Sequence, residues 1–165
     1  PSRRRAGHHA GIILDSSGGL GEFLADRLLM QAAVRSLLSD ADTVVAVPLY
    51  WWRQFSRGFN QSQVIAARLA KRSSRKLLRP LLRARDTQTQ TKLSATRRRE
   101  NMKDAFALIS PKHVQGRRVV LVDDVKTSGA TLQAAARALL PARPASIDAI
   151  VVAAADPRGR GFEAV

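Results

Sequence analysis

The sequence predicts an α/β domain with a mainly parallel sheet, and three observations support this class. Apolar, β-branched runs typical of buried strands alternate with segments whose apolar residues recur at helical spacing. The chain has 165 residues, 45% of them hydrophobic, which is enough for one domain with a core. Residues 119–131 have the pattern of a buried strand, a short loop and a helix start, the unit from which such sheets are built.

The first half of the chain contains a predicted helix, strand, loop and second helix. An asparagine before the second helix, Asn60, has Gln63 three residues later, which predicts a capping box. In order, these elements are an amphipathic helix over 20–38, a core strand over 43–49 that ends at Pro48, a loop over 50–60, and a helix from 60 to about 72.

The second half contains the strand, loop and helix start over 119–131 and the strands that are predicted on either side of it. Pro80 interrupts the first of them, which favours a short or edge strand. The remaining predictions are a strand over 76–83, a long polar loop over 86–96, a helix start over 96–102, strands at 105–109 and 119–124, a turn at 111–116, a helix over 132–140 and a buried strand over 147–155. Residues 1–17 are predicted to be a flexible basic lead, 18–155 the domain and 156–165 a loose tail.

Several classes of protein are excluded or disfavoured by composition. No run approaches 18 consecutive apolar residues, so no membrane span is predicted, and no secretory signal pattern is present. The absence of cysteine excludes disulfides and cysteine zinc sites and fits a cytoplasmic protein. The three histidines, His8, His9 and His113, do not have the spacing of a metal site.

A strongly basic segment predicts a polyanionic partner. The formal net charge is +15, and residues 71–103 hold twelve Lys and Arg against only Asp86 and Glu100. Such a segment suits phosphates, pyrophosphate or nucleic acid, whereas a role in solubility is the alternative. Charge alone does not choose among these polyanions.

The loop that follows the strand at residue 119 has the composition of a phosphate site. Small residues let the backbone wrap closely around a ligand, and successive N–H groups at a helix start form an anion site. The spacing of a Walker A loop is absent. The predicted phosphate-binding residues are Val125, Lys126, Thr127, Ser128, Gly129, Ala130 and Thr131.

Two consecutive carboxylates, Asp123 and Asp124, precede this loop. In an ideal strand they point to opposite faces, but where the chain turns both can reach the crevice. They can accept hydrogen bonds from vicinal hydroxyls or hold a hydrated magnesium ion. A solvated Asp-Asp turn is the alternative for the pair alone. Together with the phosphate loop, the pair predicts a site for a ribose 5-phosphate.

The stretch 119–131 resembles the phosphoribosyl pyrophosphate (PRPP) signature of type I phosphoribosyltransferases. The wider chain, over roughly 20–154, resembles the ComF-type competence-protein family of that superfamily. The residues that carry this wider resemblance are Pro48, Arg57, Gly58, Phe59, Asn60 and Gln61 in the first strand-end loop, and Arg85, Asp86, Thr87, Gln90, Thr91, Leu93, Ser94, Arg98, Asn101, Ala105 and Phe106 further along.

The chain departs from the family pattern in a few places. Lys92, Lys126 and Ser128 replace residues more common there. The amino-terminal zinc ribbon of many members is absent because the chain has no cysteine. Since the chain begins with Pro1 rather than methionine, loss of a ribbon by truncation and membership of a short subgroup both stay open.

The resemblance implies a type I phosphoribosyltransferase fold with a mobile lid loop, and a magnesium-dependent transfer of phosphoribosyl from PRPP to a nitrogen acceptor with release of pyrophosphate. It implies that Asp123 and Asp124 are the catalytic acids and Mg²⁺ ligands, directly or through water. It further implies a pyrophosphate loop that consists of Arg53, Arg57, Gly58, Asn60 and Gln61. It also implies a lid that consists of Gln90, Thr91, Ser94, Arg98 and Asn101.

An alternative from a different class keeps the pocket without turnover. In this interpretation the chain is an accessory module of DNA uptake or processing that binds PRPP or a nucleotide, contacts single-stranded DNA and associates with DNA-processing proteins. Trp51 and Trp52, beside arginines, can stack on bases or pack in the core. A phosphoreceiver domain is disfavoured because its acidic pair lies early in the chain. The sequence identifies neither the acceptor nor the oligomeric state.

Overall fold

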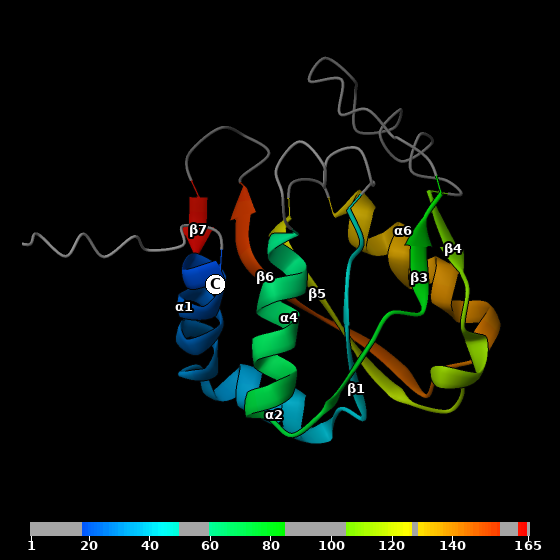
Figure 1. Cartoon of the computed structure of the whole chain (residues 1–165), viewed down its shortest axis with the longest axis horizontal. Coiled ribbons are helices and arrows are strands. Elements are labelled where there is room, and N and C mark those ends of the chain that lie inside the picture. The colour runs from blue at the N-terminus through cyan, green and yellow to red at the C-terminus, as the bar shows by residue number, and fades with distance from the viewer. Residues whose placement is uncertain (1–17, 50–59, 85–104, 127–128, 156–161, 165) are drawn as a thin grey trace, which may run out of the picture.

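The computed structural model describes residues 18–49, 60–84, 105–126, 129–155 and 162–164, which form an α/β structure (Figure 1). The helices are α1 (Gly18–Leu29), α2 (Ala32–Asp40), α4 (Gln61–Arg72) and α6 (Ala130–Leu139), with 3₁₀ turns η1 (Pro111–His113) and η2 (Leu140–Ala142). The strands are β1 (Thr43–Ala46), β2 (Lys76–Leu78), β3 (Leu81–Arg83), β4 (Phe106–Leu108), β5 (Arg118–Lys126), β6 (Ser146–Ala155) and β7 (Phe162–Ala164).

The main sheet has the strand order β2-β1-β5-β6-β7. The first four strands are parallel, and β7 pairs with β6 in the antiparallel direction. The predicted mainly parallel sheet is therefore confirmed. Because parallel strands end at the same edge, β1 and β5 deliver their following residues to one side of the molecule. Strands β3 and β4 form a separate antiparallel pair.

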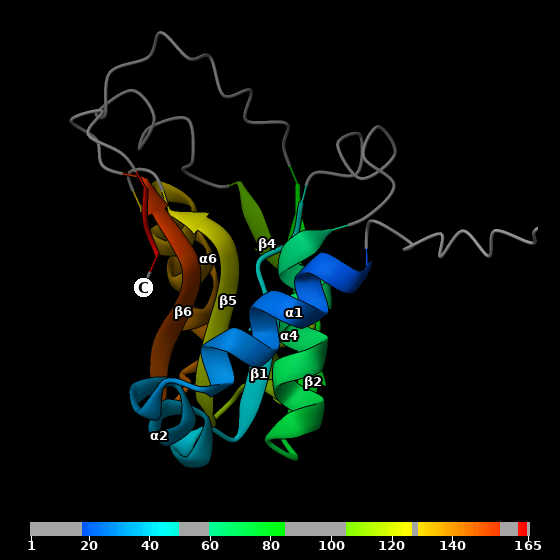
Figure 2. The same ribbon diagram turned by 90° about the vertical axis from the view of Figure 1, so that its left-hand side faces the viewer.

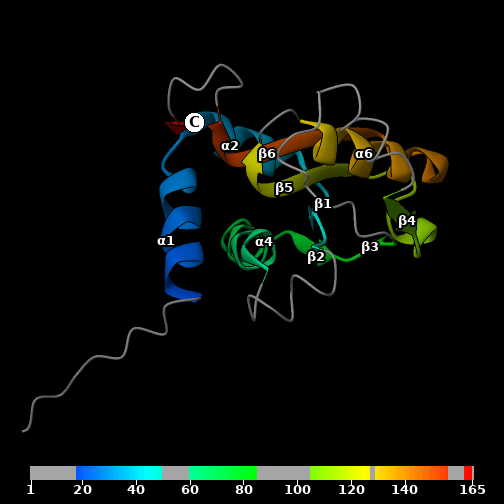
Figure 3. The same cartoon turned by 90° about the horizontal axis from the view of Figure 1, so that it is seen from above.

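Each face of the sheet has its own core, and strand alternation assigns residues to the two faces. Val44, Val120 and Val122 pack with α1, α2 and α4 on one face. Val45 and Leu121 pack on the other face with α6 and the β3–β4 pair. Seen from above, α4 and α6 lie on opposite sides of β5 (Figure 3). Both cores border β5, so the strand that carries the acidic pair is held from two sides.

The predicted single helix over 20–38 is instead two helices. α1 ends at Leu29, and the extended backbone of Gln31 redirects the chain before α2 begins. The guanidinium of Arg35 donates to the carbonyls of Leu29 (2.9 Å) and Met30 (2.7 Å), and so satisfies acceptors that a helix end leaves open. The break lets α1 pack across α4 while α2 packs beside β5 (Figure 2). No glycine or proline lies at this break, and the helical spacing of apolar residues continues through it. The pattern therefore predicted one helix.

Other predicted boundaries shift by a few residues. Pro80 separates β2 from β3, as predicted, and β2 is an edge strand of the sheet. α6 begins at Ala130, two residues before the predicted start. The prediction of a loose tail is wrong for Phe162–Ala164, which forms β7; this strand is too short to produce a recognisable alternating pattern. Residues 50–59 of the predicted loop over 50–60, and the segments 86–96 and 96–102, lie outside the described residues.

No helix in the part of the chain that the structure describes is both long and apolar enough to cross a bilayer.

Candidate functional site

Three element ends meet at the carboxyl edge of the sheet: the end of β5, the start of α4 and the start of α6. The amide of Val47, just after β1, donates to the carbonyl of Val122 at 2.9 Å, which keeps the two strand ends together. α4 begins shortly after β1, and its first turn contacts the end of β5. The ends of β1 and β5 and the start of α4 therefore lie together.

Asp123 and Asp124 both reach the first turn of α4, where Ser62 lies between them. The hydroxyl oxygen of Ser62 is 3.2 Å from Oδ1 of Asp123 and 3.4 Å from Oδ1 of Asp124. The amide of Asp124 donates to the Ser62 hydroxyl oxygen at 3.1 Å and to Oδ1 of Asp123 at 3.0 Å. The residues are consecutive and β5 continues past them to Lys126, yet both carboxylates contact one hydroxyl. The expectation that the strand ends at the acids is therefore wrong, although their convergence is present.

The electrostatics of this pair are unusual because Asp123 is 7% exposed. Burial disfavours the ionised form, and the neighbouring carboxylate of Asp124 repels a second negative charge. Together these effects raise the pKa of Asp123 to about 7, although the Ser62 hydroxyl acts in the opposite direction. At neutral pH the pair therefore shares a proton in part of the population, and donors or a cation placed beside it would favour its full ionisation.

The start of α4 is anchored differently from the predicted capping box. Asn60 is the residue before the helix, but its side chain makes no cap hydrogen bond. Its Nδ2 instead donates to the carbonyl of Val47 at 3.3 Å, which ties the helix start to the end of β1. The buried Oδ1 of Asn60 and Nε2 of Gln61 have no hydrogen-bond partner among the described residues, so two buried polar atoms flank the beginning of the helix. The Gln61 donor and the N–H groups that a helix start exposes are suited to an anionic ligand, whereas the Asn60 oxygen requires a donor.

α6 supplies a second helix start at the same edge. Gly129 precedes it with φ 72° and ψ 0°, the left-handed conformation that glycine adopts without strain. Its carbonyl accepts from the amide of Gln133 at 2.9 Å, the first bond of the helix. Since helix dipoles direct partial positive charge toward such ends, two positive ends border the acidic pair.

The predicted phosphate loop is shorter than expected. β5 continues through Val125 and Lys126, which pair with Ala153 and Ala154 of β6, so these two residues belong to the strand. Thr127 and Ser128 lie outside the described residues. Gly129, Ala130 and Thr131 occupy the turn into α6 and its first residues. The extra pairing is explained by β6, which is long enough to continue the ladder beyond the acids.

The other predicted site residues divide into two groups. Asn60, Gln61, Asp123 and Asp124 lie together at the carboxyl edge. The remaining residues of the predicted pyrophosphate loop and lid lie outside the described residues; they are Arg53, Arg57, Gly58, Gln90, Thr91, Ser94, Arg98 and Asn101.

Ser62 is a site residue that the sequence interpretation missed. A serine in a first helical turn is usually a solvated or capping residue, and nothing local links it to acids about sixty positions later. The available signal was its position directly after Asn60 and Gln61, on a helix predicted to begin at the same sheet edge.

The acidic pair fits a magnesium ion held partly by other groups. Among the described residues, no cluster of three or more His, Cys, Asp or Glu could hold a metal by itself. Magnesium is commonly held by one or two carboxylates together with phosphate oxygens and water. The donor set formed by Asp123 and Asp124 has this character.

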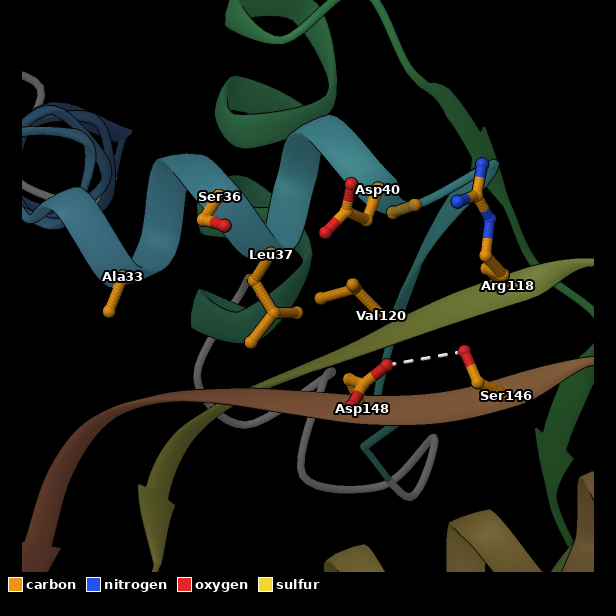
Figure 4. A pocket seen from close by; sticks show the side chains of 9 residues that line it. Ala33, Ser36, Leu37, Asp40, Arg118, Val120, Ser146 and Asp148 are labelled. Atoms are coloured by element: carbon orange, nitrogen blue, oxygen red, sulfur yellow. Dashed lines mark hydrogen bonds between the residues drawn. The ribbon is translucent and has the colours of Figure 1, made fainter.

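A separate hollow of about 380 Å³ lies at the opposite edge, between α2 and the amino ends of β5 and β6 (Figure 4). Leu37 and Val120 contribute apolar surface to it, and Ser146 donates to Asp148 at 3.3 Å on its β6 side. None of the predicted site residues within the described ranges lines it. The predicted site residues that the structure describes therefore lie at the carboxyl edge and not beside this hollow.

A family model described as the phosphoribosyl transferase domain matches residues 56–163, which include the start of α4, the acidic pair and α6. The chain belongs to this family.

Relatives of this phosphoribosyl transferase domain include proteins named for competence and DNA use. This chain is 42% identical over 93 residues to Competence protein F of Haemophilus influenzae and 43% identical over 100 residues to DNA utilization protein YhgH of Escherichia coli. It is 34% identical over 97 residues to Competence protein ComFC of Bacillus subtilis. These matches cover 55%, 60% and 59% of the chain and 41%, 43% and 38% of those proteins, so the chain spans less than half their length. The ComF-type resemblance is confirmed.

The fold of the phosphoribosyl transferase domain is also found in a solved enzyme structure. A glutamine PRPP amidotransferase from Bacillus subtilis, complexed with ADP and GMP, superimposes with a TM-score of 0.54 at 22% identity, over 79% of this chain and 25% of that one. This likeness confirms the predicted fold class.

Proposed function

We propose that the chain binds PRPP and transfers its phosphoribosyl group to a nitrogen acceptor, releasing pyrophosphate. The observation that carries the proposal is the convergence of Asp123 and Asp124 on Ser62, beside the starts of α4 and α6. Acceptors for sugar hydroxyls and two helix ends suited to phosphates are thereby adjacent. Membership of the phosphoribosyl transferase family supports the same ligand.

Each part of PRPP has a corresponding part of the site in this proposal. The 5-phosphate meets the stretch 125–131, where α6 begins and Gly129 permits the close turn. The ribose hydroxyls donate to Asp123 and Asp124. The pyrophosphate meets the start of α4 with Asn60 and Gln61, together with Arg53, Arg57 and Gly58, and the lid residues 90–101 close over it.

Magnesium, when bound, would be held by Asp123 and Asp124, directly or through water, and would neutralise charge on the pyrophosphate. The residues of the chain have their own electrostatic role. Ionised carboxylates near the sugar stabilise the positive charge that develops on the ribose ring as pyrophosphate departs.

The proposed transfer exchanges one bond at the anomeric carbon for another. The bond from this carbon to pyrophosphate oxygen breaks, and the electron pair leaves with pyrophosphate. The lone pair of the acceptor nitrogen then forms the new bond, and the nitrogen releases a proton to solvent or to product pyrophosphate. Departure of pyrophosphate generates the electrophile, so the proposal requires no dedicated general base.

Calorimetric titration with Mg-PRPP tests the binding step. We expect saturable one-site binding to the folded protein and strong loss of affinity in Asp124→Asn. A protein that remains folded but takes up no Mg-PRPP would contradict the proposal. Release of pyrophosphate on addition of nitrogen acceptors, measured with a coupled assay, tests turnover separately, because a sensor and an enzyme would bind the ligand alike.

A second candidate function is a non-catalytic module that binds single-stranded DNA during uptake or processing. The observation that favours it is the composition of residues 60–84, which contain seven basic residues and no Asp or Glu. Of these basic residues, Arg68 pairs with Asp26 and Glu22 of α1, whereas Lys71, Arg72 and Lys76 are exposed. The names of the competence and DNA-utilization relatives support a role connected with DNA. A cytoplasmic location and DNA-processing proteins as partners are part of this proposal.

Salt dependence discriminates the two functions. Binding through several phosphates releases counterions, so oligonucleotide affinity should fall steeply with added salt. Negligible affinity for a single-stranded oligonucleotide at low salt would remove the basis of this second function and leave the PRPP proposal intact.

A further inference from the structure

Ser62 occupies a buried position between the two acids and the start of α4. It is 1% exposed, although its side chain is polar. A buried hydroxyl is costly unless it is hydrogen-bonded, and this one is bonded entirely within the site. Its neighbours are Oδ1 of both carboxylates and the amide of Asp124.

These contacts form a closed arrangement across two elements. The Ser62 hydroxyl carries one proton, so it donates to only one carboxylate at a time while it accepts from the Asp124 amide. That amide is shared with Oδ1 of Asp123, which joins both acids and the serine. A rotation of either carboxylate therefore breaks a contact with Ser62.

The helix that carries Ser62 is itself fixed to the sheet. Asn60, two residues earlier, donates to the carbonyl of Val47 after β1, and α4 packs against both β1 and β5. The hydroxyl is thus supplied from a rigid element rather than from a loop. Positioning groups of this kind are most effective when their own geometry is fixed by packing.

We propose that Ser62 is a positioning residue, which holds the carboxylates of Asp123 and Asp124 in one orientation so that they accept the vicinal hydroxyls of a ribose phosphate together. The inference rests on the proposed function, because it assigns the acids to the sugar. It adds a specificity: the site prefers a ribose phosphate to the corresponding 2-deoxyribose phosphate, and Ser62 is required for the full preference.

The test compares Ser62→Ala with Ser73→Ala. Ser73 ends the same helix and donates to the carbonyl of Leu69 at 2.7 Å, so this control removes a hydroxyl far from the acids. Binding of ribose 5-phosphate, 2-deoxyribose 5-phosphate and inorganic phosphate is measured by calorimetry. We expect Ser62→Ala to weaken ribose 5-phosphate binding by about tenfold, to reduce its preference over the deoxy ligand, and to leave phosphate binding unchanged. Ser73→Ala should change none of these.

A double-mutant cycle with Asp124→Asn separates positioning from general damage. If Ser62 acts through the pair, the loss of ribose 5-phosphate affinity in the double variant is smaller than the product of the two single losses. Ser62→Cys, which nearly keeps the shape but donates weakly, replaces Ser62→Ala if the alanine variant does not fold. Independent effects of the two substitutions, or equal losses for all three ligands, would overturn the inference.

A ligand-free readout distinguishes this inference from the proposed function. Ser62→Ala removes an acceptor of the Asp124 amide, so that amide resonance should shift in the ¹H–¹⁵N spectrum, whereas Ser73→Ala leaves it in place. An unshifted resonance overturns the role of Ser62. If the resonance shifts but the wild type binds neither ribose 5-phosphate nor Mg-PRPP, Ser62 positions the acids as inferred. In that case the proposed ligand is overturned instead.

Discussion

At the scale of single residues, the buried carboxyl of Asp123 lowers the stability of the ligand-free protein at neutral pH. Its proposed role is to bind a ligand. Burial and the charge of Asp124 raise its pKa to about 7, against 3.8 for an ordinary aspartate. Between about pH 4 and pH 7 the folded protein therefore keeps a proton that the unfolded chain has released. The contribution of this group to stability is greatest below pH 4, falls as the pH rises through this window, and is constant above it.

Asp123→Asn should stabilise the ligand-free protein in a pH-dependent way. The variant removes the ionisation, so its free energy of unfolding should exceed that of the wild type by on the order of 2 kcal/mol at pH 8 and by much less near pH 4. Hydrogen bonds from Arg68 and Arg118 lower the pKa values of Asp26 and Asp42, so these two groups make stability rise with pH. Because they do so in the wild type and in the variant alike, the difference in unfolding free energy between the two proteins isolates Asp123.

Urea unfolding at several pH values measures this difference. A gap between the two proteins that is the same at pH 4 and pH 8 would contradict the assignment of the raised pKa to Asp123. The same variant should bind Mg-PRPP poorly, in line with the common observation that binding sites retain groups that reduce stability.

At the scale of elements, the close approach of α1 to α4 depends on a single glycine. An added Cβ at Gly21 would lie 2.7 Å from Cγ1 and 3.0 Å from Cβ of Val64, whose branched side chain sits at the helix surface. The first turn of α4 carries the site, so the position of α1 also bears on the orientation of Gln61, whose Nε2 would lie 3.2 Å from the new atom.

Gly21→Ala should destabilise the protein even though alanine favours helices. Overpacking costs about 1–3 kcal/mol, which exceeds the gain of up to about 1 kcal/mol from helix propensity. Gly19→Ala is the matched control, because nothing lies within 4 Å of its new Cβ, and it should be neutral or stabilising. Chemical unfolding of the two variants measures the contrast; equal stability would show that α1 adjusts without cost.

The elements also explain how far the sequence could be interpreted. The runs at Thr43, Val119 and Ile147 predicted their strands because β-branched, continuous apolar segments are typical of a parallel sheet covered on both faces. The break at Met30 escaped prediction because Arg35 stabilises it through side-chain bonds to the carbonyls, with no proline or glycine as a local sign. Contacts between distant elements decide such features.

The site shows the same division between local and distant information. Small residues were predicted to let the chain turn closely before α6, and Gly129 takes the left-handed backbone there, which is a local requirement. The bond from Asn60 to Val47 replaced a predicted capping box, and Ser62 was missed, because both depend on which strand end lies beside α4. Tertiary partners of a polar side chain are not encoded in its immediate sequence.

At the scale of the whole molecule, the sheet separates two charged edges. The acidic pair lies at the carboxyl edge, whereas α4 runs toward the opposite edge and ends in Lys71 and Arg72. Lys76 then begins β2, opposite Thr43 at the start of β1. These three basic side chains are exposed, and we call them the amino-edge cluster. Since the pair and the cluster are at opposite ends of α4, a ribose phosphate and a nucleic acid could be bound without competing.

Charge reversal of the amino-edge cluster should therefore separate the two candidate functions. In Lys71→Glu, Arg72→Glu and Lys76→Glu combined, affinity for a single-stranded oligonucleotide should fall, and the slope of log affinity against log salt should shrink by about 2, as expected when three phosphate contacts are lost. Mg-PRPP affinity should be unchanged. The control reverses Arg27, Lys112 and Arg137, which alters net charge equally at scattered exposed positions. Equal losses in both triple variants would mean that net charge, rather than a defined surface, attracts the polyanion.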